Sequence, residues 1–178
     1  VEDRERSPLE AVLAVRDEYD AASERYTLHV TQSCPATPGQ PVKEPFVIPL
    51  AMGLLGDAGN LPLHPANGGP GAETADNTHH VLIVDQRAQS FVFEQVRERP
   101  VPSLLRGFSA PVRLEYDFSK ADLYALLSRD DDGFVRWDSA QALATRVIHE
   151  VEAQIQRSAD ALVDPLLLEA CHNLLGDE

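Results

Sequence analysis

The sequence has few cysteines, a shortage of positive charge and no long apolar run. Its two cysteines, Cys34 and Cys171, lie far apart, so we expect neither a disulfide between them nor a small secreted scaffold held by disulfides. No apolar run reaches the roughly 18–20 residues that a membrane-spanning helix needs. Because two unpaired thiols suit a reducing compartment, we predict a cytoplasmic protein.

Basic residues are outnumbered, with 15 Lys and Arg against 29 Asp and Glu, and the net charge is −14. Such a surface repels the phosphates of nucleic acids and of anionic membranes, so we predict neither as a partner. The 178 residues are enough for one large domain, or for one complete domain and part of another. The charged first residues, VEDRERS, lack the apolar core of a secretory signal, and we expect the start to be a cut point inside a longer chain.

Alternating apolar and polar residues in the first two thirds of the chain predict β-strands. The clearest pattern lies within residues 89–119, where every second residue of 112–118 is apolar and the others are charged. Residues 9–19 and 26–31 are joined by a short polar linker and predict a hairpin. The alternation stops after residue 118, and we interpret this stretch as the junction between a sandwich and a helical region.

Further strands follow the same reasoning. Residues 46–54 form a long alternating pattern, and Pro49 predicts an edge position or a bulge there, since proline cannot donate a ladder hydrogen bond. The glycine-rich residues 56–80 predict a surface loop, and residues 99–102 a stiff extended bend. The remaining strands are expected at residues 81–84, 91–93 and 104–108. Seven or eight short strands with proline-rich turns predict a mainly β fold, an immunoglobulin-like β-sandwich over residues 1–118.

Residues 119–178 predict three helices. Ser119 is the expected N-cap of the first, with Asp122 completing a capping box. Asp164 and Pro165 are the expected start of the third, which runs over residues 166–175. The expected inward face of the second helix consists of Phe134, Trp137, Ala140, Ala144, Val147, Val151 and Ile155. We predict that these helices are the truncated beginning of a larger helical-repeat domain, because their apolar faces exceed what they can bury on each other.

Histidines suggest two metal sites, and neither has the required spacing. His149 and Glu150 start a zincin-like H-E-x-x-H pattern, but position 153 is Ala, so the second zinc ligand is missing. His64, His79 and His80 flank the glycine-rich loop without a tight ligand spacing or a companion cysteine. A solvent-facing pair on an acidic helix and ordinary loop histidines are the better interpretations.

Other candidate groups also favour structural roles. Asp130, Asp131 and Asp132 lack the alternating ligands of a calcium loop, so we interpret them as a solvated, helix-capping linker. Cys34 has no basic neighbour in the sequence to activate it. Residues 68–71 do not open a helix as a phosphate-binding loop does. Trp137 is expected in the core. We therefore predict no catalytic, cofactor-binding or metal-binding residue in this chain.

Four blocks of the sequence carry a resemblance to a known family. They are residues 26–33 with 35–38, residues 89–96 with 100–105, residues 108–116, and residues 132–141. In this order they resemble the bacterial aminopeptidase N (alanyl aminopeptidase) type of M1 zinc aminopeptidase, over most of the chain from about Leu9 to the end. The resemblance implies the β-sandwich that follows the catalytic domain, together with the first helices of the large C-terminal helical domain.

The resemblance also implies where the chemistry of the parent enzyme lies. The family's zinc-binding H-E-x-x-H with its downstream Glu, its G-x-M-E-N motif and its catalytic Tyr belong to upstream domains, and none is present here. The implied parent is a zinc metalloprotease that removes N-terminal amino acids from peptides. The fragment is expected to be an inactive spacer whose partners are the catalytic domain and the rest of the helical domain, with peptide substrates for the parent.

The alternative is a stand-alone immunoglobulin-like module that binds a protein or a glycan through its loops. Such a module is expected to end in polar linkers, whereas this chain ends on apolar helices. Self-association or exposed apolar surface that binds a dye would favour the fragment of a larger enzyme.

Overall fold

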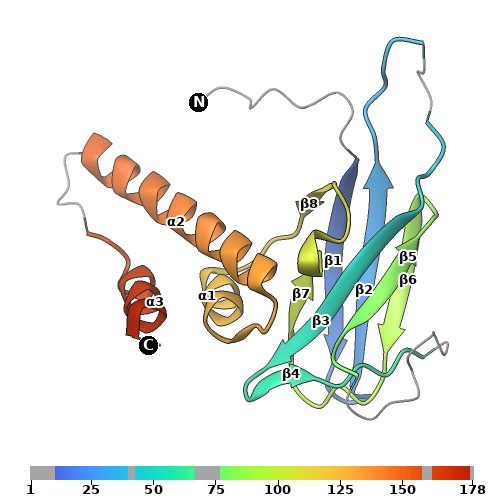
Figure 1. Ribbon diagram of the computed structural model, residues 1–178, viewed down its shortest axis with the longest axis horizontal. Helices are drawn as coiled ribbons and strands as arrows, with labels where there is room; N and C mark the ends of the chain where they lie inside the picture. The colour runs from blue at the N-terminus through green and yellow to red at the C-terminus, as the bar shows by residue number, and fades with distance from the viewer. Residues whose placement is uncertain (1–10, 40–42, 67–76, 158–161, 177–178) are drawn as a thin grey trace.

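Two small sheets face each other, and three helices lie beside them in the computed structural model (Figure 1). The structure describes residues 11–39, 43–66, 77–157 and 162–176. The prediction of a mainly β sandwich followed by helices is confirmed. The predicted strand residues 9 and 10 and the glycine-rich residues 68–71 lie outside the described residues.

The first sheet has the strand order β6-β2-β1-β8. Its strands are β1 (Val12–Asp20), β2 (Arg25–Ser33), β6 (Ala88–Phe93) and β8 (Arg113–Glu115). The predicted β1–β2 hairpin forms with full antiparallel pairing, from Val12 opposite Ser33 to Asp20 opposite Arg25. Strand β8 instead runs parallel to β1 and pairs over three residues only, so the last strand of the sandwich is shorter than its alternating sequence predicts.

The second sheet is built around β3 (Ile48–Gly56), which pairs with three other strands. They are β4 (Gly59–Leu61), β5 (His80–Val84) and β7 (Val101–Leu104). Pro49 lies opposite Ile83 of β5, while β7 joins β3 only from Met52 onward. The edge position predicted for Pro49 is therefore correct locally, although β3 is the central strand of its sheet.

The inward-facing residues of both sheets form the sandwich core. Alternate residues of β1 and β2 are buried, and the ring of Tyr26 lies tilted beside that of Phe93 with centroids 6.5 Å apart. The residues with the lowest exposure in this core include Leu13, Leu28, Leu50, Met52, Leu54, Val84 and Phe93. The period-two pattern in the sequence thus becomes one buried face on each sheet.

Two predicted segments of the sandwich are wrong. Residues 104–108 were expected as a strand, but β7 begins at Val101 and ends at Leu104, and a short 3-10 turn, η1 (Arg106–Phe108), follows. The sequence predicts a surface loop for most of residues 56–80, but their described part contains β4 and the buried Leu63, while residues 67–76 lie outside the described residues. Residues 81–84 form β5 as predicted, with Val81 and Ile83 exposed on its outer side.

The three predicted helices are present as α1 (Lys120–Arg129), α2 (Gly133–Gln156) and α3 (Pro165–Gly176). Ser119 accepts a hydrogen bond from the backbone N–H of Asp122, whose carboxylate accepts one from the N–H of Ser119, so the predicted capping box is confirmed. Asp164 accepts from the N–H of Leu166 at the start of α3. In the described part of the chain, no helix combines the length and the apolar character needed to cross a membrane.

The buried face of helix α2 shares only Val147 with the predicted one. Its buried residues are Val135, Ser139, Leu143 and Val147, so the prediction is confirmed for Val147, whereas the other six side chains expected inside are half-buried or exposed. Trp137 is 58% exposed and Ile155 is 61% exposed, so the expectation of a core Trp137 is wrong. Because both faces of α2 are apolar, periodicity alone cannot tell which one contacts α1.

Candidate functional site

The histidines singled out in the sequence do not come together. His149 and Glu150 are both exposed on α2, as expected. His64 is half-buried, His79 is exposed, and His80 is buried at the start of β5, where burial lowers its pKa. Within the described ranges, no three His, Cys, Asp or Glu side chains are grouped so that they could hold a metal ion.

The run Asp130–Asp132 makes specific hydrogen bonds and ion pairs and is not simply a solvated linker. Asp132 caps α2, as predicted, by accepting the N–H of Val135 at 2.9 Å. Asp130 is buried, however, and its carboxylate accepts a 2.9 Å hydrogen bond from Arg106 Nη2. Arg106 also contacts the exposed Asp131. The prediction of a solvated run is therefore wrong for Asp130, because a cation from the sandwich reaches it.

Arg106 joins the sandwich to the helices at what we call the junction, formed by η1, the end of β3 and the turn from Asp130 to Asp132. Its side chain is 3% exposed and the side chain of Asp130 is fully buried. Nη1 lies 3.4 Å from the carbonyl oxygen of Thr78. The N–H of Gly107 donates to Asp132 at 2.9 Å, so the backbone of η1 also binds the cap of α2. A buried charge needs such a partner, because an unpaired one is very costly.

The backbone around η1 takes conformations that few residues adopt. Leu105 has φ 56°, Gly107 has φ 61° and Phe108 has φ 54°. Leucine and phenylalanine are disfavoured in this left-handed region, so the surrounding contacts must hold them there. On β3, Gly53 leaves room for the guanidinium, since a Cβ at this position would meet Arg106 Nη1 at 2.9 Å. The strained turn of η1 and the space at Gly53 together allow the side chain of Arg106 to point toward the helices.

Apolar side chains surround this polar contact. Leu55 at the end of β3 packs with Ala125, Leu126 and Val135 of the helices, and Val101 and Phe118 pack against that cluster. The helices thus cover the outer face of the second sheet near the end of β3 (Figure 1). The junction is therefore a small second core, with a buried ion pair at one side.

Lys120 ties the three helices together at the surface. Its Nζ lies 2.6 Å from a carboxylate oxygen of Glu150 on α2 and 2.6 Å from one of Asp164, which precedes α3. The hydrogen bonds to Asp164 and Glu150 raise the pKa of Lys120, and the hydrogen bond from Lys120 lowers the pKa of Asp164. Both groups are only half-buried, so this contact positions α3 without the energetic weight of a fully buried pair.

A row of Glu18, His29 and Ser90 crosses the outer face of the first sheet. His29 Nδ1 lies 2.8 Å from Ser90 Oγ, and His29 Nε2 lies 3.5 Å from the Glu18 carboxylate. These are the residue types of a nucleophilic triad. The row is open to water, with the side chain of Glu18 65% exposed, and it lacks the enclosure that makes such groups effective. We interpret it as cross-strand pairing.

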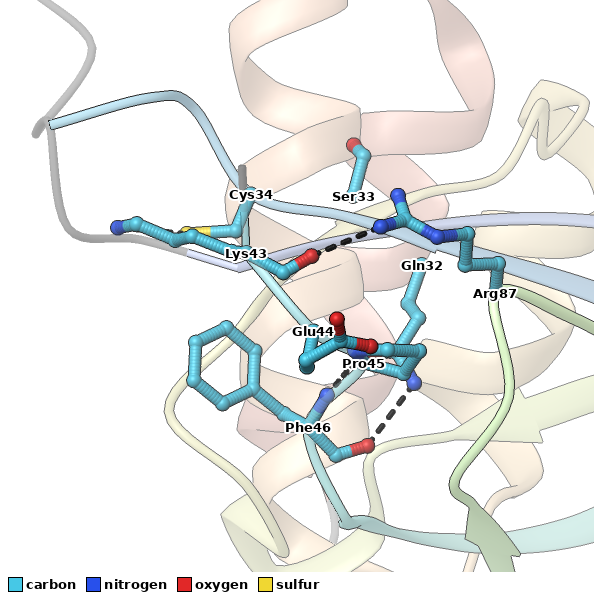
Figure 2. Close-up of a pocket in the computed structure, with 8 residues that line it drawn as sticks. All are labelled: Gln32, Ser33, Cys34, Lys43, Glu44, Pro45, Phe46 and Arg87. Carbon is cyan, nitrogen blue, oxygen red and sulfur yellow. Dashed lines mark hydrogen bonds between the residues drawn. The ribbon is translucent and has the colours of Figure 1, made fainter. Parts of the chain in front are cut away.

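A cavity of about 280 Å³ opens where β2 ends and the chain approaches β3 (Figure 2). Its lining comprises Gln32, Ser33, Cys34, Lys43, Glu44, Pro45, Phe46 and Arg87. The side chain of Gln32 fixes one wall of the cavity through two hydrogen bonds to the backbone of Phe46. The Gln32 amide N–H donates to the Phe46 carbonyl at 2.9 Å, and the Gln32 side-chain carbonyl accepts from the Phe46 N–H at 2.8 Å. The Lys43 ammonium lies 3.4 Å from Cys34 Sγ, so the cysteine has a basic neighbour that its sequence surroundings do not show.

Sequence reasoning missed the two basic residues that organise these places. Arg106 follows two leucines and precedes a glycine, and a lone charge inside an apolar stretch is a signal for a buried ion pair. Its partner, Asp130, is 24 residues away, and no local pattern links them. Lys43 is nine residues from Cys34 and meets it only through the course of the chain after β2.

Comparisons with known proteins agree with this architecture. Residues 11–117 match the family described as a domain of unknown function (DUF3458) with an Ig-like fold. Residues 120–178 match its C-terminal counterpart (DUF3458_C), described as ARM repeats. The immunoglobulin-like fold predicted from the strands is thereby confirmed.

Curated relatives and a solved structure show the same relationship. Aminopeptidase N of Escherichia coli K12 is 37% identical over 94% of this chain, and that of Haemophilus influenzae is 34% identical over 92%. The matched part spans 18% of the length of either relative. The structure of Legionella pneumophila aminopeptidase A in complex with aspartic acid superposes with a TM-score of 0.70 at 28% identity, covering 95% of this chain and 17% of that one. The chain therefore belongs to the DUF3458 family with its Ig-like fold, and it corresponds to a segment of the M1 aminopeptidases of the aminopeptidase N type.

Proposed function

We propose that this chain is the non-catalytic joint of a larger zinc metalloaminopeptidase that removes N-terminal amino acids from peptides. In this role the sandwich, residues 1–118, contacts the catalytic domain, and residues 119–178 begin the helical domain. The relatives support the proposal, because a segment of 18% of their length leaves ample room for a catalytic domain elsewhere. The joint would set the distance and the angle between the two larger parts.

The observation that carries this proposal is the buried junction. A flexible linker between two units needs no buried ion pair, whereas here Arg106 and Asp130 are held in one geometry between the sandwich and the helices. The capping box at Ser119 begins α1 at a defined residue. Both features fix the angle between the sandwich and the helices, and a spacer in a multidomain enzyme requires such a fixed angle.

Uncovered apolar side chains support the proposed partners. On the sandwich, Val81 and Ile83 are 44% and 49% exposed. On the helices, Trp137 and Ile148 are 58% and 57% exposed. Apolar surface of this kind is typical of faces that contact other domains. We assign these faces to the catalytic domain and to the remaining helices of the same polypeptide.

Zinc would be bound by the catalytic domain of the parent and not by this segment. The histidines here do not fit a zinc site, since Ala153 stands where a second helical ligand is needed and His64, His79 and His80 are not grouped. No step of the peptidase reaction is assigned to residues of this chain. The cytoplasmic location is part of the proposal, supported by the two free cysteines, Cys34 and Cys171.

A direct test measures zinc content and aminopeptidase activity of the 178-residue chain. We expect no stoichiometric zinc after dialysis against a zinc-containing buffer, and no release of chromophore from an alanyl chromogenic substrate. Full-length E. coli aminopeptidase N is the positive control for the assay. Reproducible cleavage by the purified chain that a chelator abolishes would refute the non-catalytic role.

A further inference from the structure

The contact between Cys34 and Lys43 brings a thiol and an amine together, and the proposed joint does not use it. Cys34 is half-buried just after β2, and the ammonium nitrogen of Lys43 lies 3.4 Å from its sulfur. Figure 2 shows the two side chains beside each other at one side of the cavity. The sulfur and the nitrogen are thus in non-bonded contact, so a movement of the two side chains toward each other would allow a bond to form.

The surroundings keep this pair in place and leave it accessible. Arg87 Nη2 donates to the backbone carbonyl of Lys43 at 2.9 Å, which holds the segment that carries the lysine. No ion pair joins Lys43 to a carboxylate among the residues that the structure describes. The adjoining cavity of about 280 Å³ is large enough to admit hydrogen peroxide.

We propose that Cys34 and Lys43 form a sulfur–nitrogen cross-link when the protein meets a hydroperoxide, and that thiols reverse it. The Cys34 thiolate attacks one oxygen of hydrogen peroxide, which yields a sulfenic acid and hydroxide. Hydroxide takes a proton from the Lys43 ammonium and becomes water. The free amine then attacks the sulfenic sulfur, the S–N bond forms, and the hydroxyl leaves as a second water. Sulfur loses two electrons in total and peroxide gains them.

The cross-link would have a defined structural effect. It would join the end of β2 to the segment that leads into β3, and so connect the two sheets across the rim of the cavity. The residues of this cavity are different from those of the junction at Arg106, and the cross-link is independent of the proposed joint function. The proposal therefore stands or falls without regard to any aminopeptidase activity.

The test uses the reduced chain treated with hydrogen peroxide, alkylated, digested and measured by mass spectrometry. We expect a linked peptide pair that contains both residues and has the summed mass less two hydrogen atoms. Reduction with dithiothreitol should restore the separate peptides. Cys171→Ser is the matched control, since the side chain of Cys171 is exposed and forms no hydrogen bond to a described lysine, and it should give the same yield.

Two further variants separate the chemistry from folding. Cys34→Ser should abolish the linked pair. Lys43→Arg keeps the positive charge but lacks a nucleophilic amine, so Cys34 should stop at sulfenic acid, which dimedone traps. Far-UV circular dichroism of each variant verifies the fold. A linked pair that persists in Lys43→Arg, a pair that retains an oxygen atom, or wild-type protein in which Cys34 carries only a dimedone adduct would each overturn the proposal.

Discussion

The sandwich and the helices bury their apolar residues to very different degrees. The sandwich encloses its core between two sheets, and side chains such as Leu28, Leu50 and Phe93 are fully buried. The helices enclose a small cluster around Leu143, while Trp137 and other apolar side chains of α2 remain exposed. The sandwich is therefore close to self-sufficient, whereas the helical part depends on contacts outside itself, including the junction.

The largest expected effect is the loss of Arg106. In Arg106→Met the carboxylate of Asp130 stays buried without its partner, and we expect the free energy of unfolding to fall by about 3–5 kcal/mol. Urea denaturation followed by circular dichroism measures it. The control is Arg113→Met, which removes an exposed pair with Glu115 and should cost about 0–1 kcal/mol.

A double variant tests whether the loss of stability comes from the unpaired carboxylate of Asp130 or from lost packing around Arg106. Arg106→Met combined with Asp130→Leu removes both charges, and we expect it to regain most of the lost stability. If the double variant were as unstable as the single one, packing around the junction, and not the unpaired carboxylate, would explain the loss.

Replacing one buried leucine by alanine in each region tests whether the sandwich core is more rigid than the helical core. Leu28 and Leu143 are both fully buried, and replacement of either by Ala is expected to cost about 2–5 kcal/mol. We expect Leu28→Ala at the upper part of this range, because two sheets hold the cavity open. Leu143→Ala should lie lower, because helices with uncovered faces can shift to fill the space. Equal losses in urea denaturation would contradict the proposed difference.

The smallest effect concerns the position of α3. Because the pKa of Asp164 is lowered from 3.8 by Lys120, its contribution is present above pH 3.8 and is lost as the pH falls through the lower folded value. The pKa of Lys120 is raised from 10.5, so its contribution is present below pH 10.5 and is lost only as the pH rises through the higher folded value. The contact is therefore complete at neutral pH.

Hydrogen exchange of the α3 amides tests this contact. Lys120→Met should speed exchange in α3 at neutral pH and leave the strands unchanged, since the contact touches only the helices. Lys120→Arg keeps a cation near both carboxylates and should remain close to wild type. Unchanged exchange in Lys120→Met would show that apolar contacts alone position α3.

The sequence predicts those parts of the structure whose causes are local. Alternation in residues 26–31 identifies a strand with one buried face, and Ser119 with Asp122 identifies the start of α1. A capping box needs only four consecutive residues, so its signal is complete in the sequence. The family resemblance likewise rests on continuous blocks, which the comparisons bear out.

The features that the sequence does not predict depend on distant partners. Arg106 contacts Asp130 from a turn in which Leu105 takes a left-handed conformation that its residue type disfavours. The predicted face of α2 is correct only at Val147, because apolar residues line two sides of that helix and burial depends on where α1 lies. The contact of Cys34 with Lys43 also requires the folded course of the chain.

Calorimetry of the wild-type chain tests the junction as a rigid joint most directly. If Arg106 and the surrounding apolar cluster couple the two regions, the sandwich and the helices unfold together. We then expect one thermal transition whose calorimetric enthalpy equals its van't Hoff enthalpy, and two separate transitions in Arg106→Met. Two independent transitions in the wild-type chain would contradict a rigid joint, because the helices would then melt without the sandwich.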